Sequence, residues 1–356
     1  LVTYDESDGF FDHMPPPTPP WAIGKGASTV HTTGDIEAAS GLPVGLGHRV
    51  PMMAISPWSK GGWVSSEVFD HTSVIRFLEA RFGVAEPNIS PWRRAVCGDL
   101  TSLFDFDATD AAVPAAFRDV AATSAHMNDA YWKQYYYAKP AYPETAPALP
   151  GQERGSKFAR PVPYELYVTS WSEPAQRKLW LEFSNEGSRA AVFQVYAAGA
   201  AAGPWTYTVE PGKQLSDYWL TDAQGRYDLT VYGPNGYFRQ FNGSMAEGGA
   251  DPDVIVVYDK ARSRLALSIQ NSGVLPCSVE VRANAYSNAP VRKYRLNAGQ
   301  SASLNWSFAD SGGWYDLTVS SDAPAGFARR IAGHIETGKP SVSDPLLDRS
   351  AAASGV

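Results

Sequence analysis

The sequence is short of the features that mark several classes of protein. Its 356 residues include two cysteines, Cys97 and Cys277, which lie too far apart for a CxxC metal motif and are too few for a disulfide framework. We expect both to be unpaired, buried thiols. Charged residues make up 19% of the chain and hydrophobic residues 44%. This balance excludes a disordered chain, a collagen-like fibre and a coiled coil.

Long apolar runs and basic clusters are absent as well. No stretch approaches the roughly 18 apolar residues that a membrane span needs, so we expect no transmembrane segment. The net charge is −7 and no basic patch offers a nucleic-acid footprint, so nucleic acid is not an expected partner. The chain opens with Leu1 instead of Met or a signal peptide, and we therefore expect it to be part of a longer protein.

The first 110 residues have the pattern of an α/β domain. Residues 1–4 and 49–56 are short apolar runs, and each predicts a buried strand. The long segment between them is rich in Pro and Gly, which is typical of a loop. Because two strands do not complete a doubly wound sheet, we interpret residues 1–110 as the C-terminal part of a catalytic α/β domain.

A helix is expected directly after these strands. Asp70 suits the N-cap, apolar residues follow it at helical spacing, and Gly83 suits the position just past the helix end. Residues 111–162 contain several prolines and are interpreted as an extended, proline-rich connector. Within this connector, residues 115–137 have a weak helical pattern.

The remainder of the chain repeats itself. Gly225–Val231 recurs as Gly313–Val319, and in the first copy Tyr227, Leu229 and Val231 alternate with polar residues as in a half-buried strand. A repeat of about 88 residues is too long for a solenoid and suits a small β-sandwich. We therefore expect a β-sandwich domain over 163–247, a second over 250–337, and a loose tail over 338–356.

The residues with the clearest chemistry follow the first strand. Asp5 to His13 contains four acids and a histidine within nine residues. Ligands of open α/β sheets bind beyond the carboxyl ends of the strands, and hard divalent cations prefer carboxylate oxygens. Asp5 and Glu6 can share such an ion because the strand has ended there. The alternative interpretation is a solvated acidic turn.

This acidic run resembles the signature that closes the metal site in the phosphocholine-specific phospholipase C family. That family also includes certain acid phosphatases and lies within the alkaline phosphatase superfamily. Four further segments resemble it, together with the paired C-terminal β-domains: Arg49–Pro51, Ser56–Gly62, Phe69–Glu79 and Pro91–Arg94. The resemblance implies an α/β fold, the C-terminal part of an alkaline-phosphatase-like sheet domain, followed by two tandem β-sandwich domains.

The resemblance also implies a reaction. It is the metal-dependent hydrolysis of phosphocholine phosphodiesters of the phosphatidylcholine or sphingomyelin type, with phospholipid as the substrate. Asp5 and Glu6 would complete the shell of one divalent metal ion. The Ser or Thr nucleophile and the remaining ligands would come from the N-terminal portion of the same enzyme, so we expect the present chain to be inactive alone. The family further implies a secreted or periplasmic location.

Two histidines and three aromatic residues complete the candidate site. His13 and His71 are candidate catalytic residues. An imidazole at His13 can orient a ligand or protonate the leaving alkoxide. For His71 the family resemblance implies a place near the active-site face, and the alternative for each is a structural hydrogen bond. Trp58, Trp63 and Phe10 are candidates for binding a quaternary ammonium headgroup through cation–π contacts.

Two other functions stay open. One is an acid phosphatase that acts on phosphomonoesters, which would use the same kind of site. The other belongs to a different class and is a non-catalytic binding protein built on the two β-sandwiches. The intact run from Asp5 to His13 argues against the second, because a pure binding module has no use for it.

Overall fold

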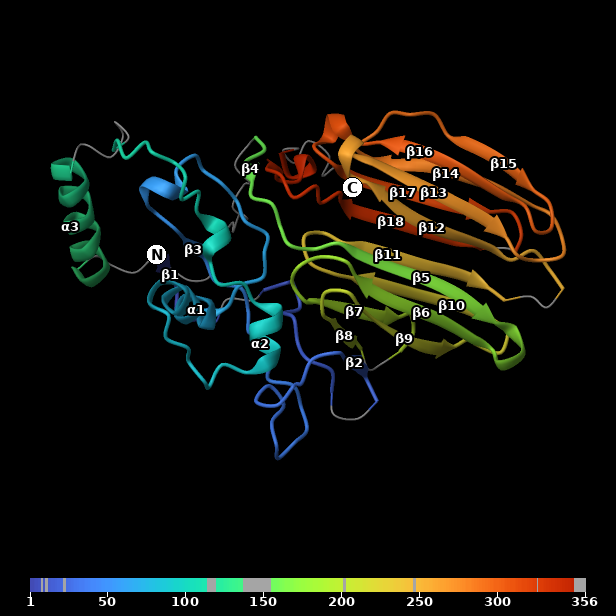
Figure 1. Cartoon of the computed structure of the whole chain (residues 1–356), viewed down its shortest axis with the longest axis horizontal. Helices are drawn as coiled ribbons and strands as arrows, with labels where there is room; N and C mark the ends of the chain where they lie inside the picture. The colour runs from blue at the N-terminus through green and yellow to red at the C-terminus, as the bar shows by residue number, and fades with distance from the viewer. Residues whose placement is uncertain are drawn as a thin grey trace.

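The computed structural model shows a chain built mainly from β-strands, with three α-helices among the residues it describes (Figure 1). This sheet-rich architecture confirms the coarse expectation. The described residues are 1–348 without 8, 10–11, 22–23, 114–119, 137–154, 201–202, 246–247 and 325.

The helices and the short strands lie mostly in the first 160 residues. The helices are α1 (His71–Phe82), α2 (Pro91–Val96) and α3 (Val120–Tyr136). The short strands are β1 (Val2–Thr3), β2 (Gly26–Ser28), β3 (Met52–Met53), β4 (Phe158–Ala159) and, near the chain end, β19 (Ser341–Val342).

The longer strands form the two repeats. The first repeat contains β5 (Leu166–Glu173), β6 (Lys178–Asn185), β7 (Ala191–Ala197), β8 (Trp205–Val209), β9 (Lys213–Leu220), β10 (Arg226–Tyr232) and β11 (Phe238–Ser244). The second contains β12 (Pro252–Asp259), β13 (Arg264–Asn271), β14 (Cys277–Ala285), β15 (Arg292–Leu296), β16 (Ser301–Ser307), β17 (Trp314–Ser321) and β18 (Ala328–His334).

Helix α1 begins and ends at the cap residues that the sequence predicts. The Asp70 side chain accepts from the backbone N–H of Ser73, and the Ser73 hydroxyl accepts from the backbone N–H of Asp70, which makes a capping box. Gly83 ends the helix in the left-handed conformation. Helix α3 lies within the segment expected to be a connector, and residues 137–154 of that segment are outside the described residues.

The two strands expected to be buried are instead short and mostly exposed. Val2 and Thr3 pair with Met53 and Met52 in an antiparallel ribbon, and Val2, Thr3 and Met53 are exposed. Among the described residues no further strand joins this ribbon. The prediction of burial is therefore wrong for the described chain, because a strand is buried only where another layer covers it.

The two repeats match strand for strand. In β6 and in β13 the apolar side chains alternate with polar ones and point into a core, as the period of two predicts. Both strands end in a fully buried asparagine. The Asn185 side-chain amide donates to the Val209 carbonyl at 2.9 Å, and that of Asn271 donates to the Leu296 carbonyl at 3.3 Å. The same buried asparagine thus joins neighbouring strands at equivalent positions of both repeats.

One large sheet connects the repeats. Its nine strands run in the order β15-β14-β17-β18-β11-β10-β7-β8-β2, and β11 pairs with β18 across the boundary between the repeats (Figure 1). A separate three-stranded sheet packs on each half, β5-β6-β9 on one and β12-β13-β16 on the other. Each pair of layers encloses its own apolar core. The repeats therefore share a sheet but keep two cores.

The first 110 residues are packed against the first repeat. Strand β2 joins the large sheet parallel to β8, and the fully buried Trp92 of α2 packs with Val96, Ala190 and Val192. The Trp92 indole N–H donates to the Thr208 hydroxyl at 2.9 Å. This contact surface fixes the N-terminal part relative to the sheet.

The tail expected to be loose is attached up to residue 348. Its strand β19 pairs with β4, and the indole N–H of Trp314 donates to the Val342 carbonyl at 2.9 Å. These backbone contacts hold a segment whose composition alone suggested disorder; residues 349–356 are outside the described residues. Cys97 and Cys277 are both free and buried, as expected. No helix among the described residues is long and apolar enough to cross a membrane.

Candidate active site

The acidic turn lies on the wall of a large groove. This groove, of about 1880 Å³, is lined by residues from the first 113 positions, from 159–164, from the repeats and from the tail. Asp5, Glu6 and His71 are among the lining residues, and so are Tyr232 and Phe238 of the nine-stranded sheet. His71 and Asp5, which are 66 positions apart in the sequence, therefore lie together at the surface of this groove.

His71 connects the helix to the turn. It is the first residue of α1, and its Nε2 lies 2.9 Å from the backbone carbonyl oxygen of Asp5. Because a carbonyl oxygen only accepts, Nε2 carries the proton and donates. His71 therefore holds the backbone of the first candidate ligand.

The last acid of the turn has a structural partner. Both carboxylate oxygens of Asp12 accept from the Arg49 guanidinium, at 2.8 and 2.9 Å, and the backbone N–H of Arg49 donates to the same group at 3.0 Å. The hydrogen bonds from Arg49 hold the pKa of the Asp12 carboxyl well below its usual range. Asp12 thus fastens the end of the turn to residue 49 and stays ionised.

Asp5 and Glu6 remain available as ligands. Both are exposed, and no hydrogen bond or ion pair to either carboxylate is found within the described part of the chain. Carboxylate oxygens without partners fit a divalent cation, since they are the donors such ions prefer. Within the same described residues no group of three or more His, Cys, Asp and Glu side chains converges. The pair therefore suits part of a coordination shell.

The other expected site residues are more scattered. His13 is exposed and, unlike His71, is not among the residues that line the groove. Trp63 lines it, but its ring packs on Phe158 at 5.3 Å and carries the Arg160 guanidinium 4.5 Å from its centroid. Trp58 packs on Phe106 at 6.0 Å. Phe10 lies outside the described residues.

One residue near the turn was not expected there. His48 lines the groove, and its Nδ1 lies 3.5 Å from the Ser7 hydroxyl. The signal that points to it is its position directly before Arg49, in a segment that already resembled the family.

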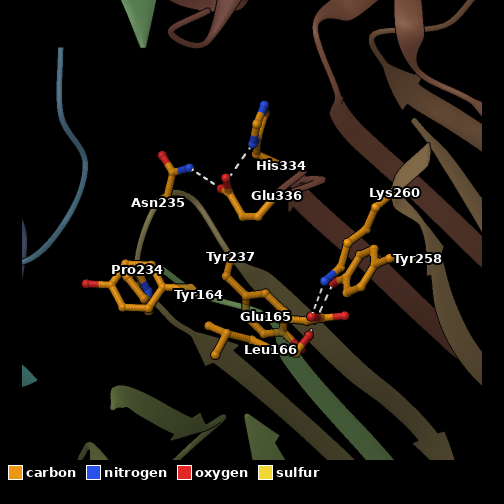
Figure 2. A pocket seen from close by; sticks show the side chains of 10 residues that line it. All are labelled: Tyr164, Glu165, Leu166, Pro234, Asn235, Tyr237, Tyr258, Lys260, His334 and Glu336. Atoms are coloured by element: carbon orange, nitrogen blue, oxygen red, sulfur yellow. Dashed lines mark hydrogen bonds and ion pairs between the residues drawn. The ribbon is translucent and has the colours of Figure 1, made fainter. Parts of the chain in front are cut away.

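A second, small pocket lies at the junction of the repeats, and Figure 2 shows its lining. Its charged groups are paired with one another: Glu336 lies 3.0 Å from His334 and accepts from Asn235 at 2.5 Å, while Lys260 pairs with Glu165. Such internal pairing joins the repeats and occupies these charged groups, so the groove is the better candidate site.

Comparison with known proteins matches both parts of the chain to family models. The family described as bacterial phospholipase C, C-terminal domain, matches twice, over residues 158–244 and 252–334, and the phosphoesterase family matches residues 1–85. The acidic turn and His71 therefore lie in the phosphoesterase segment, and the two repeats correspond to the two copies of the C-terminal domain.

Individual proteins match along nearly the whole chain. The chain is 51% identical to a hemolytic phospholipase C of Pseudomonas aeruginosa, over 99% of this chain and 52% of that protein. It is 47% identical to a non-hemolytic phospholipase C of Burkholderia pseudomallei, over 98% of this chain and 50% of that protein. A phospholipase C B of Mycobacterium tuberculosis is 46% identical over 30% of this chain and 21% of its own length. The chain thus spans about half the length of the first two relatives, and it belongs to the bacterial phospholipase C family.

Proposed function

We propose that this chain is part of a metal-dependent phospholipase C that hydrolyses phosphocholine phosphodiesters. The observation that carries the proposal is the pair of unpartnered carboxylates, Asp5 and Glu6, on the groove wall within the segment that matches the phosphoesterase family. The names of the relatives support the phospholipase C activity. The preference for phosphocholine follows from the resemblance of the Asp5–His13 run.

The chain's own residues would hold and orient the metal. Asp5 and Glu6 would supply two oxygen ligands, and a divalent cation bound there supplies Lewis-acid polarisation of a phosphoryl oxygen. His71 keeps the Asp5 backbone in place through its 2.9 Å hydrogen bond. Arg49 keeps the far end of the turn in place through Asp12. Trp63, on the same groove, is the best placed of the three aromatic candidates for a cationic headgroup.

The remaining parts of the site would come from elsewhere. We infer that the Ser or Thr nucleophile and the other metal ligands belong to the part of the relatives' length that this chain does not span. In this proposal residues 1–110 complete an alkaline-phosphatase-like α/β domain on the far side of the groove. The repeats over 163–247 and 250–337 are two tandem β-sandwiches, and the whole protein is secreted or periplasmic.

The test compares the chain with the longer protein that contains it. The 356-residue chain alone should not hydrolyse p-nitrophenyl phosphorylcholine, whereas the longer protein should. In the longer protein Asp5→Asn should lower both the metal content and kcat/KM, the latter by at least about 100-fold. The matched control is Asp110→Asn, an exposed acid that pairs with Lys60 instead, and it should change neither.

Three results would overturn the proposal. Hydrolysis by the isolated chain would remove the need for a second part of the site. Unchanged metal content in an Asp5→Asn, Glu6→Gln double variant would show that these carboxylates are not ligands. A preference for p-nitrophenyl phosphate over the diester would favour the acid phosphatase.

A further inference from the structure

A ladder of aromatic side chains crosses the outer face of the sheet β5-β6-β9. Trp171, Trp180 and Tyr218 are direct neighbours on the three strands. The two indole rings are parallel, with an interplanar angle of 3° and centroids 5.5 Å apart, and the Tyr218 ring lies 5.0 Å from that of Trp180. Trp171 is 44% exposed and Tyr218 42% exposed. The ladder is therefore a surface feature and not part of the core.

The fold does not require aromatic residues at these positions. In the second repeat the equivalent neighbours are Val257, Ala266 and Asn305, and they form the same three-stranded arrangement. Outward positions of a strand that faces water are normally polar. Since the same sheet forms without the ladder, the ladder serves a purpose other than folding.

Further exposed apolar side chains extend the ladder into a wider face. Leu220 at the end of β9 is 67% exposed, and Ile255 and Val257 on β12 are 44% and 52% exposed. Strand β12 lies beside β5, because the Tyr258 hydroxyl donates to the Leu166 carbonyl at 3.2 Å. We call this surface the aromatic face; it consists of Trp171, Trp180, Tyr218, Leu220, Ile255 and Val257. None of these residues lines the groove of the candidate active site.

A lysine supplies charge at the edge of this face. The Lys178 Nζ lies 4.3 Å from the Tyr218 ring centroid and 5.7 Å from that of Trp180. It hydrogen-bonds Gln176, and within the described chain it pairs with no carboxylate. Its cross-strand neighbour is Glu173, whose carboxylate accepts from the Trp180 indole N–H at 3.1 Å. A lysine beside Trp and Tyr suits the headgroup level of a lipid surface, where aromatic rings and lysine stems lie between water and the acyl chains.

The ring geometry argues against a sugar as the occupant. A saccharide stacks on free aromatic faces. Here the two indole rings are stacked on each other, and Lys178 lies over the ring of Tyr218. One face of each of these rings is thus covered by a neighbour, and the exposed aliphatic groups of Leu220, Ile255 and Val257 suit insertion among lipid headgroups.

We propose that the aromatic face docks the protein on a phospholipid bilayer, with Lys178 against a lipid phosphate. This inference rests on the proposed function, because a phospholipase must reach a substrate that lies in a bilayer. It adds a second lipid contact that is separate from the groove and takes no part in the chemistry.

The test is co-sedimentation of the 356-residue chain with phosphatidylcholine vesicles. A Trp171→Ala, Leu220→Ser double variant should lower the partition onto vesicles by at least about tenfold, because it removes two large apolar contacts. The control is Val274→Ser, Leu275→Ser, which removes two exposed apolar side chains of the second repeat outside the aromatic face and should leave binding unchanged.

The lysine is tested in the same assay. Lys178→Glu should weaken binding, while Lys178→Arg keeps the charge and should preserve it. Thermal unfolding of every variant checks that the sheet is intact. If the double variant has the melting temperature of the unmodified chain and still binds vesicles equally well, the proposal is wrong.

Other occupants give other results. If the double variant loses binding to dextran but keeps binding to vesicles, the occupant is a sugar and the proposal is wrong. If it loses a concentration-dependent dimer but keeps binding to vesicles, the occupant is a second copy of the chain and the proposal is wrong. The proposed function is tested separately by Asp5→Asn, which should bind vesicles like the unmodified chain. Vesicle binding that persists while the longer protein shows no phospholipase activity would refute the proposed function and leave the docking face intact.

Discussion

The Arg239 guanidinium of the first repeat donates a hydrogen bond to the Tyr315 hydroxyl of the second repeat at 3.1 Å. A reciprocal bond is present, because Arg329 of the second repeat donates to the Tyr227 hydroxyl of the first at 3.0 Å. Both arginines are almost fully buried. Each repeat therefore extends a cation toward the edge of the other's core.

The register between β11 and β18 explains this reciprocity. Gln240 and Arg330 occupy equivalent positions in the two repeats, and they pair directly with each other. Equivalent residues of two antiparallel strands lie opposite each other when a twofold rotation relates the strands. The repeats are thus related by an approximate twofold axis through this pair, and the two buried arginines lie symmetrically beside it.

Loss of Arg239 should weaken the junction. Arg239→Met keeps an apolar stem of similar length but removes the guanidinium that donates to the hydroxyls of Tyr258 and Tyr315. Since hydrogen bonds to charged groups contribute more than neutral ones, we expect the free energy of unfolding in urea to fall by about 2–4 kcal/mol. Arg226→Met, which removes an exposed ion pair with Asp222, should have a much smaller effect, because solvent screens exposed ion pairs. Equal losses would contradict a special role for the junction.

The local features of the fold could be predicted from the sequence. The caps of α1 at Asp70 and Gly83 are set by side chains within a few residues of the helix ends, so the helix boundaries followed directly. The repeat was visible because Gly225–Val231 and Gly313–Val319 keep the same alternation. The joining of β11 to β18 was not visible, because strand pairing between distant segments leaves no local signal.

The candidate site could also be predicted in part, for the same reason. Asp5 and Glu6 stand out because acids gather after a strand, but the contact between His71 and Asp5 joins residues 66 positions apart. The burial of residues 1–4 was predicted wrongly, since a strand's composition does not show whether another layer covers it. Arg239 was missed because a charged residue in an alternating strand normally faces water.

Trp92 should control the attachment of the N-terminal part to the first repeat. Trp92→Ala opens a cavity in a fully buried position, so we expect the free energy of unfolding to fall by about 3–5 kcal/mol. Trp92→Phe keeps most of the packing but loses the hydrogen bond to Thr208, and should cost about 1–2 kcal/mol. Phe82→Ala, at an exposed position, is the control and should cost less than about 0.5 kcal/mol. A Trp92→Ala variant as stable as this control would rule out the contact.

The pairing of strand β2 with β8 should require glycine at position 26. A Cβ atom at this position would lie 1.8 Å from the Thr206 carbonyl oxygen, so Gly26→Ala is incompatible with the pairing of β2 and β8. We expect the variant to lose hydrogen-exchange protection at residues 26–28. Gly24→Ala is a matched control, because Gly24 also has positive φ but no atom within 4 Å of its Cβ; it should cost about 1 kcal/mol and keep the protection. Equal protection in both variants would contradict the clash.

The pair of Glu79 and Arg94 should give a defined pH dependence. Hydrogen bonds from Arg94 and from the backbone N–H of Glu86 lower the pKa of Glu79 to about 2. Because the folded-state pKa is depressed, the stabilisation is complete above the unfolded value of roughly 4.3 and is lost as the pH falls toward 2. The melting temperature of the unmodified chain should exceed that of Glu79→Gln by a constant amount near neutral pH, and the difference should shrink below about pH 4. If the difference in melting temperature grew as the pH fell, the pKa of Glu79 would be raised in the folded protein and the prediction would be wrong.

His71 should act on the proposed metal site through the backbone of Asp5. His71→Phe keeps a ring at the start of α1 but removes the donor that faces the Asp5 carbonyl. In the longer protein we expect metal affinity to fall by about 10–100-fold, the range seen when a group that orients a ligand is lost, with faster amide exchange at residues 5–7. His13→Phe is the control, since its side chain is exposed and has no hydrogen bond within the described chain. If His71→Phe leaves metal affinity and amide exchange unchanged but shifts one limb of the dependence of kcat on pH, His71 transfers a proton itself. If His13→Phe shifts that pH dependence instead, the proton-transfer role belongs to His13.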